Sequence, residues 1–450
     1  MLGIIVPIAV MFAIALIPKI PKIGGNIAVA LAAGGLLSLV MNGIFDPMMW
    51  LEACISGLDS MGYLLLLTVA GGLFAQAQKR IGAMDGIVQV LRALFGRSSY
   101  GLVVCVLIAL CIAGSLMGAS SPCIAVVGVL VVPSLIDLGL SANQIGAALV
   151  MGASVGSIMP PVTQAIYLSC TLLNIDPAEV LGLSYLTVGG CFLVICFYVC
   201  KFFVGSKKLP SELLPEETAG TILKKYGYTL VPVIMLLALV ILNNGFKIDL
   251  VTMALSPFFT FVKQFRVIKA FSNVVVCSLA ICFLLCFFYK KARQDVKGIF
   301  VGAGKSLRNV LLINLACAFM VGCFGISGMT DTIKDFALTL NLNAMKLGGA
   351  VCMAVIGMLT GTQSAAQNTI FTFLGPALLE SGVSPSHAAI AGSHIAASGQ
   401  GMPPADGVTF ACCGILGGMV PEKPNPLKIM FLCAPFWLYL FLCGVLFMYI

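Results

Sequence analysis

The sequence predicts an all-α polytopic membrane protein built from two inverted repeats. The chain of 450 residues is 60% hydrophobic and 9% charged, whereas soluble domains carry about 25% charged residues. Its apolar runs are continuous, as spanning helices of about twenty residues require, and do not alternate as the strands of a membrane barrel do. In addition, two segments rich in Gly and Pro, one in each half, match each other.

Ten apolar runs are long enough to be spanning helices. They cover residues 2–17, 26–45, 57–77, 99–117, 185–204, 228–243, 270–289, 306–324, 346–360 and 429–449. The first run starts at Met1 without a basic region or a cleavage site, so we expect a retained span and not a signal peptide. Three other stretches, 114–172, 245–268 and 357–417, are apolar but rich in Gly, Pro, Ser and Thr. We do not expect these three stretches to be simple spans.

Charge and cysteine content exclude two other classes of protein. The net charge is +8, but the basic residues lie in short connectors, which is the positive-inside pattern and not a nucleic-acid surface. The 18 cysteines lie mostly inside apolar runs and form no metal-binding spacing. We therefore expect packing residues, with no disulfide framework and no cofactor.

The repeat is clearest in the two Gly- and Pro-rich segments. GSLMGASS at Gly114 aligns with GMLTGTQS at Gly357, a shift of 243 residues, and the alignment continues without a gap through both Pro-Pro pairs. Gly and Pro set backbone geometry, so the match predicts one backbone shape used twice. We expect a first repeat at 1–205, a cytoplasmic connector at 206–225 and a second repeat at 226–450.

Charged flanks predict that the two repeats run in opposite directions. Lys79 and Arg80 follow the span at 57–77, whereas Lys290 and Lys291 precede its counterpart in the second half. By the positive-inside rule, matching elements then cross the membrane in opposite senses, as in the inverted repeats of secondary transporters. The basic connector at 263–269 disagrees, because this topology places it outside.

Each Gly- and Pro-rich segment contains a turn of small residues and a helix interrupted at Pro-Pro. Irregular backbone at membrane depth survives only where protein or a polar cavity surrounds it, and a matched pair predicts a transport site near the midplane. Candidate binding residues in the first segment are Gly118, Ser120, Ser121, Pro122, Gly156, Ser157, Pro160, Pro161 and Thr163. Those in the second are Gly361, Thr362, Gln363, Ser364, Asn368, Gly399, Gln400, Pro403, Pro404 and Asp406.

These residue types favour a coupling cation and an organic anion. Carbonyls freed by Pro-Pro can coordinate Na⁺, and helix N-termini suit a carboxylate. We expect Na⁺ at Ser120, Ser121 and Gly156, and at Thr362, Ser364 and Gly399. Neither segment's core contains Arg or Lys. The charge of the solute must therefore be balanced by helix N-termini, bound cations or neutral donors.

Asp406 leaves three interpretations open. A carboxylate inside a membrane segment is costly and marks function by default. Asp406 could bind Na⁺, carry a proton, or cap the half-helix that starts at Gly407; its counterpart is Thr163. His387 is expected at a helix start, and His394 is either a packing residue or a proton relay.

The run from Gly114 to Tyr167 resembles the signature of the large membrane subunit of TRAP transporters, and the second copy, ending SGQGMPPADGVTF, is similar to their second repeat. The resemblance implies a bacterial inner-membrane carrier with an elevator mechanism: scaffold helices stay fixed while re-entrant hairpins and broken helices move. It implies Na⁺-driven import of a dicarboxylate or sugar acid. The expected partners are a small four-helix membrane subunit and a periplasmic solute-binding protein.

Two departures from the family pattern keep an alternative open. Val162 follows the first Pro-Pro, where the family has Ser, and Ala405-Asp406-Gly407 follows the second, where the family has Val-Gly. A stand-alone, proton-coupled organic acid carrier is the alternative. A channel fits less well, since filters usually use rings of identical subunits. We expect no enzyme, because the spans carry no His-Glu-x-x-His and no paired aspartates.

Overall fold

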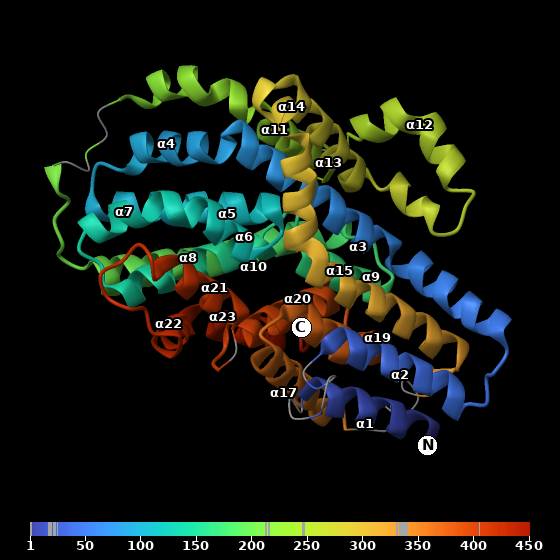
Figure 1. Ribbon diagram of the computed structural model, residues 1–450. Coiled ribbons are helices and arrows are strands. Elements are labelled where there is room, and N and C mark those ends of the chain that lie inside the picture. The colour runs from blue at the N-terminus through green and yellow to red at the C-terminus, as the bar shows by residue number, and fades with distance from the viewer. Residues whose placement is uncertain are drawn as a thin grey trace.

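The structure is a computed structural model that describes residues 2–16, 20, 24, 26–211, 214, 217–244, 248–329, 332, 341–404 and 406–450. The predicted all-α architecture is confirmed, since the described residues contain helices and connectors and no strand (Figure 1). Among the described residues, six helices are long and apolar enough to cross a membrane; the pair α22 (Pro426–Leu432) and α23 (Ala434–Leu446), bent by 51°, makes seven if it is counted as one span.

The helices of the first half are α1 (Leu2–Leu16), α2 (Ile27–Met41), α3 (Pro47–Ile81), α4 (Ala83–Phe95), α5 (Ser99–Met117), α6 (Ser120–Cys123), η1 (Ile124–Gly128), α7 (Val129–Asp137), α8 (Ala142–Ile158), α9 (Gln164–Leu173), α10 (Ala178–Tyr198) and η2 (Val199–Val204). Those that follow, up to α15, are α11 (Ala219–Asn244), α12 (Leu250–Val262), η4 (Ile268–Ser272), α13 (Val274–Leu285), η5 (Cys286–Phe288), α14 (Lys290–Gln294) and α15 (Val296–Ile326). The last are α17 (Leu342–Thr360), α18 (Gln363–Ala366), η6 (Gln367–Phe371), α19 (Thr372–Glu380), α20 (Pro385–Gly401), α21 (Gly407–Leu416), α22 (Pro426–Leu432) and α23 (Ala434–Leu446).

Several helices differ in length from the predicted runs. The run at 99–117 is exactly α5, whereas α3 and α15 extend well beyond 57–77 and 306–324. Both begin at an aspartate cap in a polar stretch: Asp46 accepts from Met48 N (2.9 Å) and Asp295 from Gly298 N (3.0 Å). Hydropathy marks only the apolar part of a helix and misses its polar ends, and α11 likewise starts inside the predicted connector.

The stretch at 245–268, which we did not expect to be a simple span, contains one bent helix among its described residues. Leu250–Val262 forms α12, capped by Asp249, whose side chain accepts from Thr252 N at 2.8 Å. Pro257 lies inside this helix, and Leu255 has non-helical backbone angles (φ −107°, ψ 17°). The proline therefore bends the helix without ending it.

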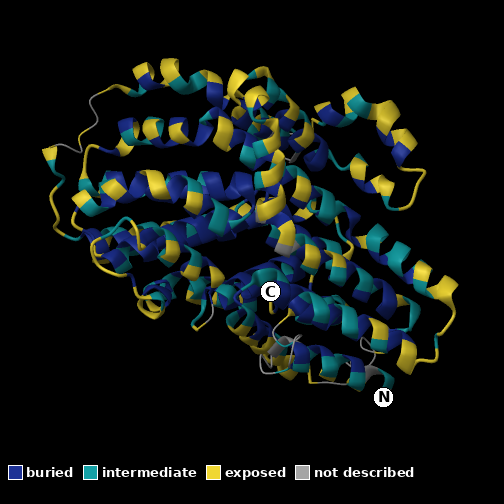
Figure 2. Cartoon of the chain, viewed as in Figure 1, coloured by how far each residue is buried: buried dark blue, intermediate teal, exposed yellow. Residues whose placement is uncertain are grey.

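Among the described helices, α3 and α15 share the most extensive contact, and α15 also packs on α2 (Figure 1). Glycines allow this approach in both directions: a Cβ on Gly57 would overlap the carbonyl of Ala318, and one on Gly322 would overlap the carbonyl of Ala53. Buried residues continue through α5 and α8 (Figure 2). Large apolar side chains on α10 and α11, such as Leu186 and Ile234, are exposed, as on a lipid-facing surface.

The repeat predicted from sequence is present element by element. The series α5, α6, η1, α7, α8 and α9 recurs as α17, α18, η6, α19, α20 and α21, with the same shift of 243 residues at every helix end. η1 and η6 are both π-helical turns. The Pro160–Pro161 and Pro403–Pro404 bonds are both cis.

Candidate functional site

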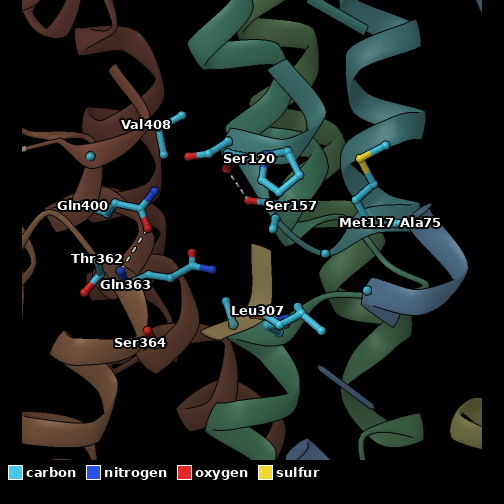
Figure 3. Close-up of a pocket in the computed structure, with 18 of the residues that line it drawn as sticks. Ala75, Met117, Ser120, Ser157, Leu307, Thr362, Gln363, Ser364, Gln400 and Val408 are labelled. Carbon is cyan, nitrogen blue, oxygen red and sulfur yellow. Dashed lines mark hydrogen bonds between the residues drawn. The ribbon is translucent and has the colours of Figure 1, made fainter. Parts of the chain in front are cut away.

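Both predicted clusters line one cavity of about 320 Å³, called here the central cavity (Figure 3). Its predicted lining residues are Gly118, Ser120, Ser121, Pro122 and Ser157 from the first repeat, and Gly361, Thr362, Gln363, Ser364 and Gln400 from the second. α3 and α15 supply further wall. The fold thus brings together two segments that lie more than half the chain apart.

The other predicted residues do not line the cavity. They are Gly156, Pro160, Pro161, Thr163, Asn368, Gly399, Pro403, Pro404 and Asp406. Gly156 and Gly399 face the helices that cross theirs: a Cβ on Gly156 would lie 2.7 Å from the Cys111 carbonyl oxygen. Their own carbonyls each accept one bond, from Met159 N at 3.0 Å and Met402 N at 3.2 Å. A carbonyl has a second lone pair, so either can still take a cation.

The carbonyl of Pro161 and the N–H of Val162, both at the first break, have hydrogen-bond partners within the protein. The Tyr167 hydroxyl donates to it at 2.7 Å, and Val162 N donates to the Ser115 carbonyl at 3.1 Å. Backbone groups released at the first break are therefore partly satisfied within the protein, as burial at membrane depth requires.

The first cluster forms where α5 ends. Gly118 has φ +63°, a left-handed conformation that suits glycine, and turns the chain into α6. Ser120 Oγ donates to Ser157 Oγ at 3.0 Å, and Ser157 Oγ donates to the Ser154 carbonyl at 2.9 Å (Figure 3). These bonds fix both hydroxyls at the cavity wall, and no side chain caps the start of α6.

The second cluster repeats this geometry with longer side chains. Gly361 has φ +66°. Gln363 N donates to Gln400 Oε1 at 2.9 Å. Gln363 and Gln400 are the equivalents of Ser120 and Ser157 in the first repeat. Because a backbone N–H can only donate, the oxygen of Gln400 faces Gln363 and its NH₂ group is left as a donor. The Gln363 side chain extends into the cavity toward Ser157 (Figure 3).

Unsatisfied polar atoms gather in the second cluster. Within the described chain, Thr362 Oγ1, Gln367 Oε1 and both amide atoms of Asn368 are buried without a hydrogen-bond partner. Gln367 Nε2 donates to the Ala165 carbonyl (2.6 Å) and Ser169 Oγ (2.8 Å) on α9, so its oxygen is the free atom. The matching residues in the first repeat are Ala119, Ile124 and Ala125. Buried unpaired oxygens require an explanation, and an ion or water is the usual one.

Asp406 is the cap of α21. It is 1% exposed and accepts from Val408 N (3.0 Å), Thr409 N (3.1 Å) and Thr409 Oγ1 (2.5 Å). Thr163 occupies the same position before α9, where it accepts from Ile166 N at 3.4 Å. The chain's own carboxylate therefore occupies the α21 N-terminus that was expected to receive the solute's carboxylate.

The two histidines lie away from the central cavity. His394 is buried, with Nδ1 3.0 Å from Ser393 Oγ and Nε2 2.9 Å from Thr187 Oγ1. His387 lies in the first turn of α20, where its N–H donates to Ser384 Oγ at 3.4 Å.

Sequence reasoning missed the lining residues on other helices. They are Gln76 and Lys79 on α3, Leu307 and Asn314 on α15, and Gln164, Gln367 and Val408 near the breaks. Gly72, Gln76 and Lys79 follow helical spacing on one face of α3. That spacing is visible in the sequence, but only the packing of α3 shows which face borders the cavity.

Comparison with known proteins gives a family and a fold. Residues 5–450 match the family described as "Tripartite ATP-independent periplasmic transporter, DctM component". A comparison with curated sequences found no match. The fold is similar to that of the YdaH transporter of Alcanivorax borkumensis (TM-score 0.61, 16% identity, 88% of this chain and 85% of that chain). It is also similar to that of MtrF of Neisseria gonorrhoeae, from a class of antimetabolite efflux pumps (TM-score 0.58, 12% identity, 92% and 84%).

Proposed function

The chain belongs to the DctM-component family of tripartite ATP-independent periplasmic transporters, and we propose that it imports a small organic anion across the bacterial inner membrane by coupling to a cation gradient. The family is one of transporters, so the chain is a membrane permease and not an enzyme. A tripartite system also implies a small membrane subunit and a periplasmic binding protein as partners.

The single observation that carries the proposed solute site is that two turns, at residues 118–122 and 361–364, both line the central cavity. These turns are called here the hairpin tips. Apart from Lys79, the described lining of the cavity is neutral and offers donors: the hydroxyl of Ser121, the amide of Gln363 and the NH₂ group of Gln400, whereas the Ser120 hydroxyl already donates to Ser157. Such groups can bind a carboxylate without leaving an unpaired charge in the membrane when the solute departs. Dicarboxylates and sugar acids are the anion classes that we propose.

For coupling, we favour Na⁺ over H⁺, with the second cluster as the stronger cation site. Thr362 Oγ1, Gln367 Oε1 and Asn368 Oδ1 are neutral oxygens without partners, and the Gly399 carbonyl has a free lone pair. The first cluster offers Ser120, Ser121 and the Gly156 carbonyl, but the Ser120 hydroxyl is already paired with Ser157. Hard cations prefer oxygen ligands. An oxygen without a hydrogen-bond partner can bind a cation without losing a hydrogen bond.

An elevator movement is the proposed transport step. The hairpins and broken helices form matched units around the solute site, while α3 and α15 pack on one another along their length. In this proposal the matched units carry solute and cation past the α3–α15 pair. In this proposal the two units are inverted copies.

The test is the Na⁺ dependence of uptake in cells that express the complete transport system. Thr362→Val keeps the shape of the side chain but removes a ligand, and Ser364→Ala removes the adjacent hydroxyl. We expect the Na⁺ concentration for half-maximal uptake to rise about tenfold in Thr362→Val, since one lost ligand costs roughly 1.4 kcal/mol. A smaller rise is expected for Ser121→Ala.

The matched control is Thr360→Val, because the Thr360 hydroxyl donates to the Ile356 carbonyl at 2.7 Å and does not line the cavity. Its Na⁺ dependence should match the wild type. Unchanged Na⁺ dependence in both Thr362→Val and Ser364→Ala, at normal protein levels, would remove this cluster from the cation site.

A further inference from the structure

We propose that Lys79 is the residue that recognises the negative charge of the solute, at the mouth of the central cavity. This inference rests on the proposed function, because it assumes an anionic solute. Lys79 is the one charged residue that borders the cavity in the described chain. It is also exposed, and among the lining residues it shares that property only with Gly407. It therefore lies where the cavity meets the surroundings.

Lys79 forms no ion pair with any described acidic residue. The adjacent Arg80 forms an ion pair with Asp295, which neutralises it. The other ion pairs among described residues join Arg266 to Glu52 and Asp59, and Lys269 to Asp59. Lys79 thus remains a free cation beside a cavity whose described lining contains no acidic residue.

The position of Lys79 on α3 also indicates which end of the solute it would contact. It follows Ala75 by one helical turn on the cavity face of α3, and Figure 3 places Ala75 across the cavity from Thr362 and Ser364. An anion in the cavity would then have two recognised ends. The charged end faces α3, while hydroxyl or carbonyl groups at the other end face the amides and hydroxyls of the hairpin tips.

Lysine suits this task at a cavity mouth. Its ammonium group has three donors on a flexible stem, so it can follow a carboxylate that enters or leaves. An exposed ion pair contributes little, so the expected effect on affinity is about two- to fivefold, and added salt screens it. A solute with hydroxyls and one carboxylate, such as a sugar acid, uses both ends of the cavity.

The experiment measures binding by the shift in thermal unfolding of the purified full chain in saturating Na⁺. The probes are succinate, D-gluconate and D-glucitol, the last of which has the chain and hydroxyls of gluconate without its carboxylate. We expect Lys79→Gln to weaken binding of gluconate about threefold and leave that of glucitol unchanged. Lys79→Arg should retain most of the affinity, and choline chloride should reduce the difference between wild type and Lys79→Gln.

The control is Lys305→Gln on α15, an exposed lysine that does not line the cavity; it should change neither affinity. Equal affinity of wild type and Lys79→Gln for gluconate would overturn the role of Lys79 and leave the proposed function intact. An equal loss for gluconate and glucitol would also overturn it, since that pattern reports packing and not charge. A wild-type chain that binds neither acid would overturn the proposed function and this inference together.

Discussion

At the scale of single residues, the central cavity is lined by neutral groups, with Lys79 at its mouth as the one charged residue in the described lining. A charged side chain at membrane depth is costly, and the cost is highest whenever its partner is absent. Gln363, Gln400 and the cluster serines avoid that cost because they need no counter-ion. Asp406, which does not line the cavity, is a buried carboxylate that accepts three hydrogen bonds from the start of α21.

The Asp406→Asn variant tests whether this carboxylate is only a cap. Asn keeps the shape and one acceptor oxygen but loses the charge and the proton. If Asp406 is a cap, uptake should survive with the same Na⁺ and pH dependence, and stability should fall by about 1 kcal/mol because fewer donors are satisfied. The measurements are uptake at graded Na⁺ and pH, together with thermal unfolding in detergent.

Thr163→Ala is the matched variant, because Thr163 caps α9 at the equivalent position; it should lose a similar amount of stability without a change in coupling. Loss of uptake in Asp406→Asn, with solute binding retained, would contradict the cap interpretation. That result would favour the proton-coupled alternative.

At the scale of elements, glycine pairs set how closely the helices of each repeat cross. A Cβ on Gly114 would lie 2.8 Å from Gly156 Cα, and a Cβ on Gly357 would lie 2.9 Å from Gly399 Cα. α5 and α8 therefore touch backbone to backbone, as do α17 and α20. Small residues permit such contact in membrane helices, and van der Waals packing then holds the pair.

Gly399→Ala should destabilise the protein by about 1 to 3 kcal/mol, the usual cost of overpacking. Its Cβ would lie 2.5 Å from the Ala354 carbonyl oxygen and 2.9 Å from Ala354 Cα, both backbone atoms that cannot move aside. The control is Gly348→Ala on α17, where nothing lies within 4 Å of the new methyl group. Thermal unfolding should give an unchanged or higher midpoint for Gly348→Ala, and an equal midpoint for Gly399→Ala would contradict the crossing described.

Element boundaries could be predicted where the sequence itself ends a helix. α5 was predicted exactly, because Ser98 caps its start and Gly118 adopts the left-handed conformation at its end. The start of α3 at Pro47 was not, since Glu52 interrupts the apolar pattern before the predicted run of 57–77, in which Asp59 lies. These acids pair with Arg266 and Lys269 from the segment after α12, a contact that hydropathy cannot reveal.

At the scale of the whole molecule, the sequence predicted the two polar clusters but not the helices that complete the cavity. Repeated Gly and Pro fix local backbone shape, so the clusters could be located without tertiary information. Lys79 and Asn314 required the arrangement of α3 and α15, which depends on long-range packing. Two hydrogen bonds, from Gln367 Nε2 to the Ala165 carbonyl and to Ser169 Oγ, join the two repeats, and no local sequence pattern predicts them.

At this scale, the proposed inverted relation of the repeats makes a prediction about the loops between α7 and α8 and between α19 and α20. Gly139 and Gly382 are equivalent positions in them, both with left-handed φ (+79° and +89°). The first loop borders the central connector: Lys207 Cε is 4.0 Å from the position of a Cβ on Gly139. If the repeats are inverted and the connector is cytoplasmic, the Gly139 loop faces the cytoplasm and the Gly382 loop faces the periplasm.

Epitope tags inserted after Gly139 and after Gly382 test this arrangement without the ambiguity of cysteine labelling in a chain with 18 cysteines. In right-side-out vesicles, antibody should reach the Gly382 tag alone, and in inverted vesicles it should reach the Gly139 tag alone. A tag after Lys208, in the connector, is the control and should behave as the Gly139 tag does. Two loop tags on the same side would show that the repeats run in parallel, and the proposed elevator movement of inverted units would then lose its structural basis.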